Sequence, residues 1–161
     1  MIPTGAVLDF RASENVADRS IWFNGFRLTR RVSGEQTENR YALLEAFGTP
    51  GTEPPLHIHE REDEFFYVLD GELLVTRGEE QIRVLPGESV FLPRGVPHTF
   101  RIKPPSARAL VLISPSGFEQ FFWELGVPAP TDELPPDYQY PSMDRILEVS
   151  ARVGIRYPAT T

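Results

Sequence analysis

The three histidines of the chain lie near one another in the sequence and close to a glutamate. His57 and His59 are separated by one residue, Glu64 follows five residues later, and His98 completes the set. Imidazole and carboxylate ligands suit a divalent transition-metal ion, with iron, manganese, nickel, copper, cobalt and zinc as candidates. Four protein ligands on an octahedral ion leave positions for water, dioxygen or substrate, as in catalytic rather than closed structural sites. These residues therefore predict an open mononuclear metal site.

The spacing of these residues suits a small β-barrel. In an extended strand, His57 and His59 point to the same face, and in a barrel alternate residues face inward. A carboxylate and a further histidine from other strands can then meet the pair at one interior point. The same alternation predicts an apolar pocket for an apolar or aromatic small molecule. We expect this substrate pocket to be lined by Phe66, Val68, Phe91, Phe100 and Ile102.

Short strand-like segments rich in branched and aromatic residues make up most of the chain before residue 115. Turn residues such as Asp70-Gly71 and Pro86-Gly87 separate them. Many short strands at even spacing predict an all-β barrel or sandwich. The expected strands are 6–10, 20–29, 41–47, 57–59, 64–69, 72–77, 81–85, 89–92, 98–102 and 109–114.

The remaining residues predict a helical C-terminal part. Ser116 followed by Glu119 has the pattern of a capping box, so we expect a helix up to about 125 that Gly126 ends. A second, amphipathic helix is expected over 143–153, with Ser142 as its N-cap and Gly154 as its C-terminal stop. The predicted division is a barrel with its N-terminal strands over 1–115 and a helical appendage over 116–161 that packs on it.

Length and composition exclude several classes of protein. The 161 residues predict one domain, and the absence of cysteine excludes disulfides and thiolate metal sites. A net charge of −7 argues against nucleic-acid binding, and no apolar run is long enough to span a membrane. The first residues lack the features of a signal peptide, which predicts a cytoplasmic protein. Open sheet edges, the N-terminal strands and the amphipathic helix predict a homodimer.

The spacing of the histidines and glycines resembles the two motifs of the cupin superfamily. The first motif is matched by Gly51, His57, His59, Glu64 and Gly71, and the second by Gly87, Pro93, Gly95 and His98. Ile102 stands where the second motif has an asparagine, so the pocket should be more apolar than is usual for the motif. The resemblance implies a double-stranded β-helix, or jelly roll, with His57, His59, Glu64 and His98 as metal ligands.

A finer resemblance is to small single-domain cupins similar to bacterial quercetin dioxygenases. It rests on residues 54–73, PPLHIHEREDEFFYVLDGEL, and on the tail over 117–154. It implies that the metal coordinates an enolate oxygen of the substrate and that dioxygen is added. Glu64 would then be both a ligand and the catalytic base that takes the hydroxyl proton. The other acidic residues of this stretch, Glu60, Glu62 and Asp63, are expected to be solvated.

The residues leave other functions open. The ion could act as a Lewis acid in an isomerase, a decarboxylase or a lyase. The protein could also be a non-catalytic module that holds a small ligand against the metal, or a metal-free descendant. A hydrolase with an activated serine is disfavoured, because all three histidines are assigned to the metal.

Overall fold

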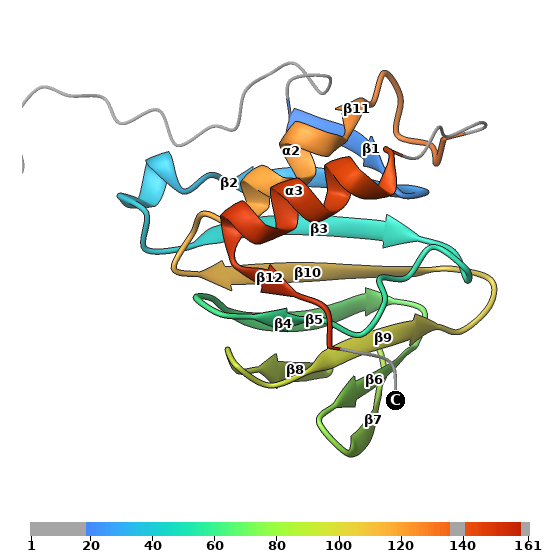
Figure 1. Cartoon of the computed structure of the whole chain (residues 1–161). Helices are drawn as coiled ribbons and strands as arrows, with labels where there is room; N and C mark the ends of the chain where they lie inside the picture. Colours follow the sequence, from blue (N-terminus) through green and yellow to red (C-terminus); the bar gives the residue numbers. More distant parts are fainter. Residues whose placement is uncertain (1–18, 136–140, 159–161) are drawn as a thin grey trace, which may run out of the picture.

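The computed structural model describes residues 19–135 and 141–158, which form an antiparallel β-barrel with two helices at one end (Figure 1). The strand expected over 6–10 lies outside the described residues. The strands expected over 89–92 and 98–102 have the predicted bounds. The strands are β1 (Ser20–Phe23), β2 (Phe26–Val32), β3 (Ala42–Gly48), β4 (Ile58–His59), β5 (Asp63–Asp70), β6 (Leu73–Arg77), β7 (Glu80–Val84), β8 (Ser89–Leu92), β9 (His98–Ile102), β10 (Ala107–Ser114), β11 (Val127–Pro128) and β12 (Ile155–Arg156); a 3₁₀ turn, η1 (Glu35–Thr37), links β2 to β3.

The strands form two facing layers. One is a seven-stranded sheet in the order β11-β1-β2-β3-β10-β5-β8, and the other consists of the sheets β7-β6-β9 and β12-β4. The inward-facing side chains of both layers form the core, in which Val68, Val75 and Val84 are at most 1% exposed. The structure therefore confirms the predicted all-β jelly roll with short C-terminal helices.

The segment expected to be one strand over 20–29 is a hairpin, so that prediction is wrong. Strands β1 and β2 pair across the two-residue turn Asn24-Gly25, whose φ angles are 50° and 82°. Positive φ at both positions is what a type I′ hairpin turn requires, and Asn-Gly supplies it with little strain.

Helices α2 (Glu119–Leu125) and α3 (Met143–Val153) lie where the sequence predicts helices. Helix α3 has the predicted ends: the Ser142 hydroxyl accepts the N–H of Arg145 at 3.3 Å, and Gly154 has a φ of 84°. The predicted capping box of α2 is wrong. Phe118 is its N-cap residue and makes no side-chain cap, while the Glu119 carboxylate accepts the N–H of Gly117 at 2.6 Å.

Residues after 115 also complete both layers of the barrel. Strand β11 pairs with β1, and β12 pairs with β4 so that Ile155 lies opposite His59. Helix α3 buries Val149 fully in a second core cluster that contains Leu44 and Ile113 from the large sheet. The tail therefore fixes the position of β4, which carries one of the predicted metal ligands.

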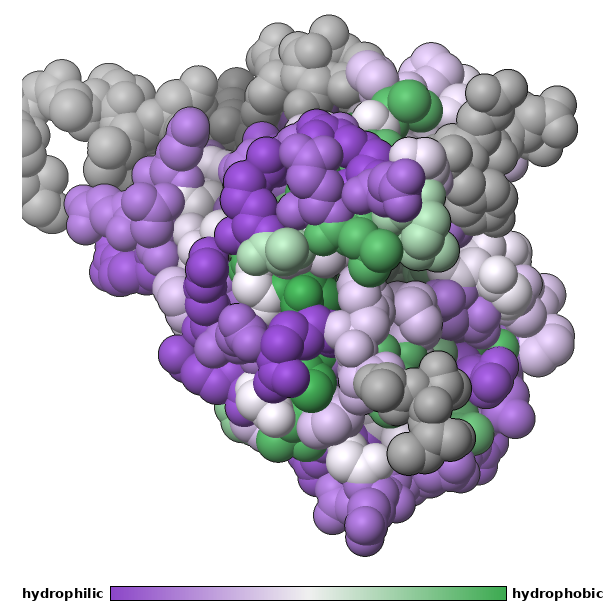
Figure 2. Space-filling view, in the orientation of Figure 1, coloured by the Kyte–Doolittle hydropathy of each residue, from purple (hydrophilic) through white to green (hydrophobic). Residues whose placement is uncertain are grey.

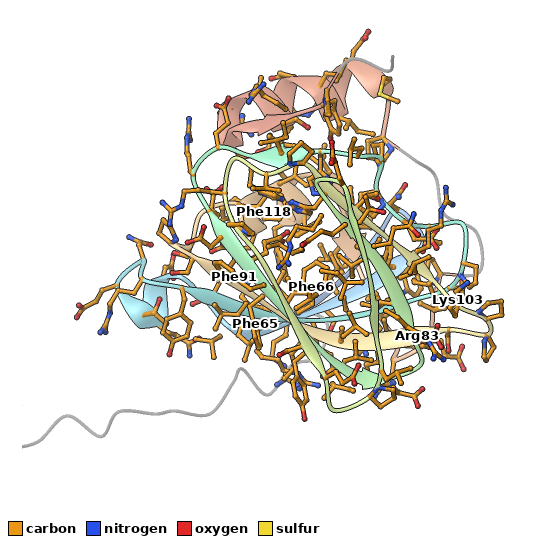
Figure 3. All side chains as sticks on the ribbon, turned by 90° about the horizontal axis from the view of Figure 1, so that it is seen from below. Phe65, Phe66, Arg83, Phe91, Lys103 and Phe118 are labelled. Carbon is orange, nitrogen blue, oxygen red and sulfur yellow. The ribbon has the colours of Figure 1, made fainter. Side chains whose placement is uncertain are left out.

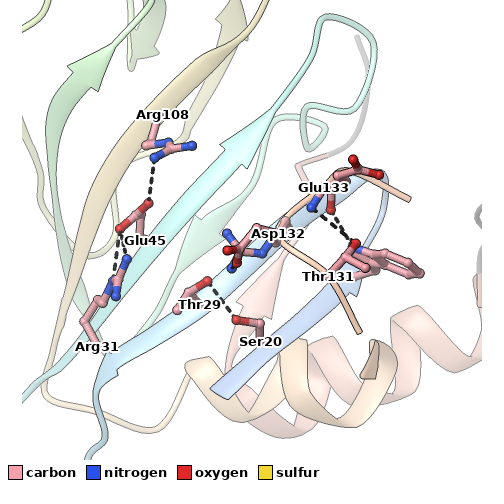
Figure 4. Close-up of polar contacts among 10 residues, drawn as sticks. Ser20, Thr29, Arg31, Glu45, Arg108, Thr131, Asp132 and Glu133 are labelled. Carbon is pink, nitrogen blue, oxygen red and sulfur yellow. Dashed lines mark hydrogen bonds and ion pairs between the residues drawn. The ribbon is translucent and has the colours of Figure 1, made fainter. Parts of the chain in front are cut away.

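Polar side chains cover the outer face of the large sheet at β1 to β3 (Figure 4). The Ser20 and Thr29 hydroxyls are 3.0 Å apart, and the Glu45 carboxylate accepts hydrogen bonds from Arg31 and lies 3.6 Å from Arg108. Glu45 therefore faces away from the barrel interior. Within 19–135 and 141–158, neither helix has the length and apolar character needed to cross a membrane.

Candidate metal centre

The structure brings His57, His59, Glu64 and His98 together inside the barrel. Glu64 lies on β5 of the large sheet, His59 on β4 and His98 at the start of β9. The backbones of His57 and His98 exchange two hydrogen bonds, of 3.1 and 2.9 Å, which hold the two residues opposite each other. All four side chains are buried, and one potential ligand atom from each lies within 4.8 Å of the others. This group could hold a metal ion.

Backbone carbonyls fix the orientation of two of the imidazoles. Nδ1 of His57 lies 2.9 Å from the carbonyl oxygen of Pro55, and Nδ1 of His98 lies 3.0 Å from that of Val96. A nitrogen beside a carbonyl oxygen must be the N–H donor, so Nε2 of each neutral ring presents its lone pair. This arrangement is typical of metal-binding histidines.

The Glu64 carboxylate lies where the lone pairs of the histidines converge. Its Oε2 is 3.1 Å from Nε2 of His98 and 3.4 Å from Nε2 of His59. Lone pairs on nitrogen and on a carboxylate oxygen repel one another unless a proton or a cation lies between them. The donor set and its geometry therefore fit a divalent metal ion.

The ionisation of His57 and Glu64 also suits metal binding. Burial lowers the pKa of His57 to about 4, and the neighbouring His98 and His59 act in the same direction, so His57 is neutral at pH 7. Burial alone would raise the pKa of Glu64, but His59 and His98 outweigh it and lower the pKa to about 2. A neutral imidazole and an ionised carboxylate are the forms that bind metal.

The cluster opens into a cavity of about 810 Å³ between the barrel and helix α3. Figure 2 shows apolar side chains that gather beneath α3 on this face of the molecule. His57 and Glu64 line this cavity, whose other walls are largely apolar and aromatic. The polar groups of Asn24 and Thr52 are engaged in hydrogen bonds to the carbonyls of Thr52 and Thr49. A ligand in this cavity would therefore meet the predicted metal ligands within mainly apolar walls.

Four of the five predicted pocket residues point into the barrel, but to different depths. Phe66 and Phe100 line the large cavity, and Ile102 lines an adjoining small cavity of about 30 Å³ together with both of them. Val68 is fully buried in the core and is not among the residues that line either cavity.

The expectation that Phe91 faces the pocket is wrong. Strand β8 pairs with β5 so that Leu92 lies opposite Glu64, and this register places Phe91 opposite Phe65 on the outer face. Phe91 is 49% exposed and Phe65 is 37% exposed. Figure 3 labels both residues, together with the inward-facing Phe66 and Phe118.

The contribution of the tail to the cavity was not predicted from the sequence. Side chains from the end of the barrel, the two helices and the segment after them form one wall: Phe118, Phe121, Phe122, Met143, Ile146, Leu147 and Tyr157. The amphipathic pattern of α3 predicted only that this helix packs against another part of the protein, without indicating which part. The ring of Phe118 also contacts His59, with 4.2 Å between the ring centroids.

Comparisons with known proteins agree with this geometry. A family model described as a cupin domain matches residues 49–113. The chain is 28% identical to the quercetin 2,3-dioxygenase of Bacillus subtilis over 148 residues, which are 91% of this chain and 43% of that protein. It is 41% identical to the quercetin 2,3-dioxygenase of Aspergillus japonicus over 78 residues, 45% of this chain and 22% of that protein. The chain thus spans less than half the length of either relative.

Among solved structures, the fold is similar to that of an RmlC-like cupin from Shewanella frigidimarina. The TM-score is 0.54 at 18% identity, over 68% of this chain and 96% of the other. At 18% identity this similarity is evidence for the fold alone.

Proposed function

Since the chain belongs to the cupin superfamily, we propose that it is a metal-dependent dioxygenase acting on an apolar aromatic or enolisable small molecule. His57, His59, Glu64 and His98 would hold one divalent transition-metal ion. The observation that carries the proposal is that two members of this cluster, His57 and Glu64, also line a largely apolar cavity of about 810 Å³. Similarity to the quercetin 2,3-dioxygenase of Bacillus subtilis over 91% of the chain supports the same reaction class.

The cavity supports a flat, mostly apolar substrate. Its volume lies within the range of sites for small molecules, about 300–1,000 Å³. Phe26 and Phe66 each place a ring edge-to-face against Phe100, with centroids 6.1 and 5.7 Å apart. Rings in this arrangement present apolar surfaces against which an aromatic substrate can pack.

Glu64 would accept a proton from the substrate. It is deprotonated at pH 7, and Glu64 is one of the residues that line the cavity. A hydroxyl group that enters the cavity beside Glu64 could transfer its proton to the carboxylate, which leaves an enolate. When bound, the ion would stabilise the enolate and supply the reactivity toward dioxygen. The apolar walls would keep water away from the reacting group.

The proposal predicts oxygen-dependent turnover of a flavonol. Protein reconstituted with iron, nickel, manganese, copper or cobalt is expected to consume quercetin and dioxygen together under air, and to leave quercetin unchanged under nitrogen. An oxygen electrode and the absorbance of quercetin measure the two losses. Equal turnover with and without dioxygen would instead favour an isomerase or lyase. Tight binding of quercetin and related enols without product would favour a non-catalytic binding protein.

We also propose that the chain forms a homodimer, and the structure offers a surface other than the predicted edges. Phe65, Tyr67 and Leu69 on β5 and Phe91 on β8 are each 37–49% exposed on one outer sheet face. Contiguous exposed apolar surface commonly marks an interface, and a single patch can cover itself in a two-fold dimer.

Light scattering is expected to give twice the 18.2 kDa mass of one chain. Replacing Phe65 and Phe91 together by serine should give the monomer mass, because the centre of the apolar patch is lost. Met143→Ser, at a position 66% exposed on α3, is the control and should remain dimeric. A wild-type protein that stays monomeric at micromolar concentration would contradict the proposal.

A further inference from the structure

Glu62 is a buried carboxylate beside the metal cluster that the mechanism above does not use. The sequence predicts a solvated side chain, but Glu62 is only 4% exposed. Among the described residues, its Oε2 has no hydrogen-bond partner. The guanidinium of Arg94 is paired with Asp63, at 2.8 Å. A buried polar oxygen without a hydrogen-bond partner is unfavourable, so a donor is expected close to it.

The group that Glu62 faces is His59. Its Oε2 lies 3.8 Å from Nδ1 of His59, slightly beyond hydrogen-bond distance. Within the described part of the chain, both ring nitrogens of His59 also lack hydrogen-bond partners. Phe118 packs its ring against the imidazole, and both residues are at most 4% exposed. Two buried, unpartnered polar groups thus lie beside each other.

The three histidines differ in what their Nδ1 atoms face. For His57 and His98 this partner is a neutral backbone carbonyl, whereas for His59 it is the carboxylate of Glu62. Coordination through Nε2 would place the remaining proton of His59 on Nδ1, directed at Glu62. A carboxylate that accepts this proton fixes the ring and makes Nε2 a stronger donor to the metal.

We propose that Glu62 is a positioning residue for the metal site, whose carboxylate accepts the Nδ1–H of His59 and thereby strengthens metal binding. The inference rests on the metal site of the proposed function.

Cobalt(II) is the probe for this role, because its visible absorption reports binding and it shifts the proton resonances of its ligands. Glu62→Ala is expected to weaken Co²⁺ binding about 10- to 100-fold, measured by competition with a chelator of known affinity. Glu62→Gln retains an oxygen that can accept the N–H and should lose less affinity. Glu60→Gln is the matched control, since Glu60 is exposed and pairs with Arg156 at the surface.

A proton spectrum in water separates positioning from a general structural role. The Co²⁺ protein should show three shifted, exchangeable imidazole N–H signals. Glu62→Ala should lose or shift one of these and keep the two whose donors face backbone carbonyls, while Glu62→Gln should retain all three. The unfolding midpoint of the metal-free variants should change little.

The two possible failures are distinguishable. Wild-type affinity and three unchanged N–H signals in Glu62→Ala would overturn the role of Glu62 and leave the metal site intact. A wild-type protein that binds no Co²⁺ would overturn the metal site itself, and this inference with it.

Discussion

Replacing His98 with alanine is expected to abolish metal binding while the barrel remains folded. The imidazole of His98 contributes Nε2 to the cluster, 3.1 Å from the Glu64 carboxylate. Loss of partners that contact a metal only through its ligands already costs about 10- to 100-fold in affinity, so loss of a ligand should cost more than 100-fold. The backbone hydrogen bonds between His98 and His57 do not depend on the side chain, so strand β9 should persist.

Elemental analysis of protein purified without chelators measures this effect. The wild type should carry about one transition-metal ion per chain, and His98→Ala almost none. Arg101→Ala is the control, because Arg101 is exposed on the same strand. Turnover of quercetin should fall with metal content in the same three proteins.

Thermal or urea unfolding provides a second measurement of the same prediction. A ligand that binds only the folded state at 1,000 times its dissociation constant stabilises that state by about 4.1 kcal/mol. The wild type should therefore be more stable with metal than with a chelator, whereas His98→Ala should be equally stable in both. Full metal content in His98→Ala would place the ion elsewhere. If the wild-type protein takes up no metal even when metal is added, the cluster does not bind metal.

The sequence could predict the histidine cluster because two local rules are sufficient to place it. Residues two apart in a strand share a face, and inward faces meet inside a barrel. The same rule fails for Phe91. The strand over 89–92 (SVFL) has apolar residues on both faces, so alternation alone does not show which face is turned inward. The phase of this four-residue strand is set by its pairing with β5, where Leu92 lies opposite Glu64. That pairing joins residues far apart in the chain.

Other differences have separate causes. The Asn24-Gly25 turn is a local signal for a hairpin, so that hairpin was predictable from the sequence and was missed. Strands β11 and β12 contain two residues each, which is too short for any periodicity. Glu62 lies in an acidic stretch that suggests solvation, but the bend after His59 turns its side chain back toward the imidazole. Only the tertiary structure shows that this carboxylate is buried.

Filling the cavity at Ala46 is expected to abolish substrate binding and leave the metal in place. Ala46 lines both the large cavity and the small one, together with Phe26, Phe66 and Phe100. It lies on β3 between Leu28 and Ala109 of the neighbouring strands, away from the four clustered residues. In Ala46→Trp the indole should therefore occupy the barrel side of the cavity, where we expect the aromatic part of a substrate.

The dissociation constant of quercetin is measured by fluorescence for a series of variants with increasingly large side chains at position 46. Ala46→Ser keeps the volume of the side chain and should bind as the wild type does. Ala46→Val should bind more weakly, and Ala46→Trp at least 10-fold more weakly, which corresponds to about 1.4 kcal/mol. Co²⁺ affinity should be the same throughout the series. Unfolding curves identify any variant in which the larger side chain strains the core.

The two sets of variants test separate parts of the proposed function. His98→Ala removes the ion and leaves the apolar walls, whereas Ala46→Trp keeps the ion and fills the space beside it. If quercetin binds Ala46→Trp as tightly as the wild type, the substrate does not enter between Phe26, Phe66 and Phe100. The remaining wall is then formed by Met143, Ile146 and Leu147 of α3, which line the same cavity from the opposite side. Loss of binding in Ala46→Trp with full Co²⁺ affinity would instead place the substrate inside the barrel, within reach of Glu64.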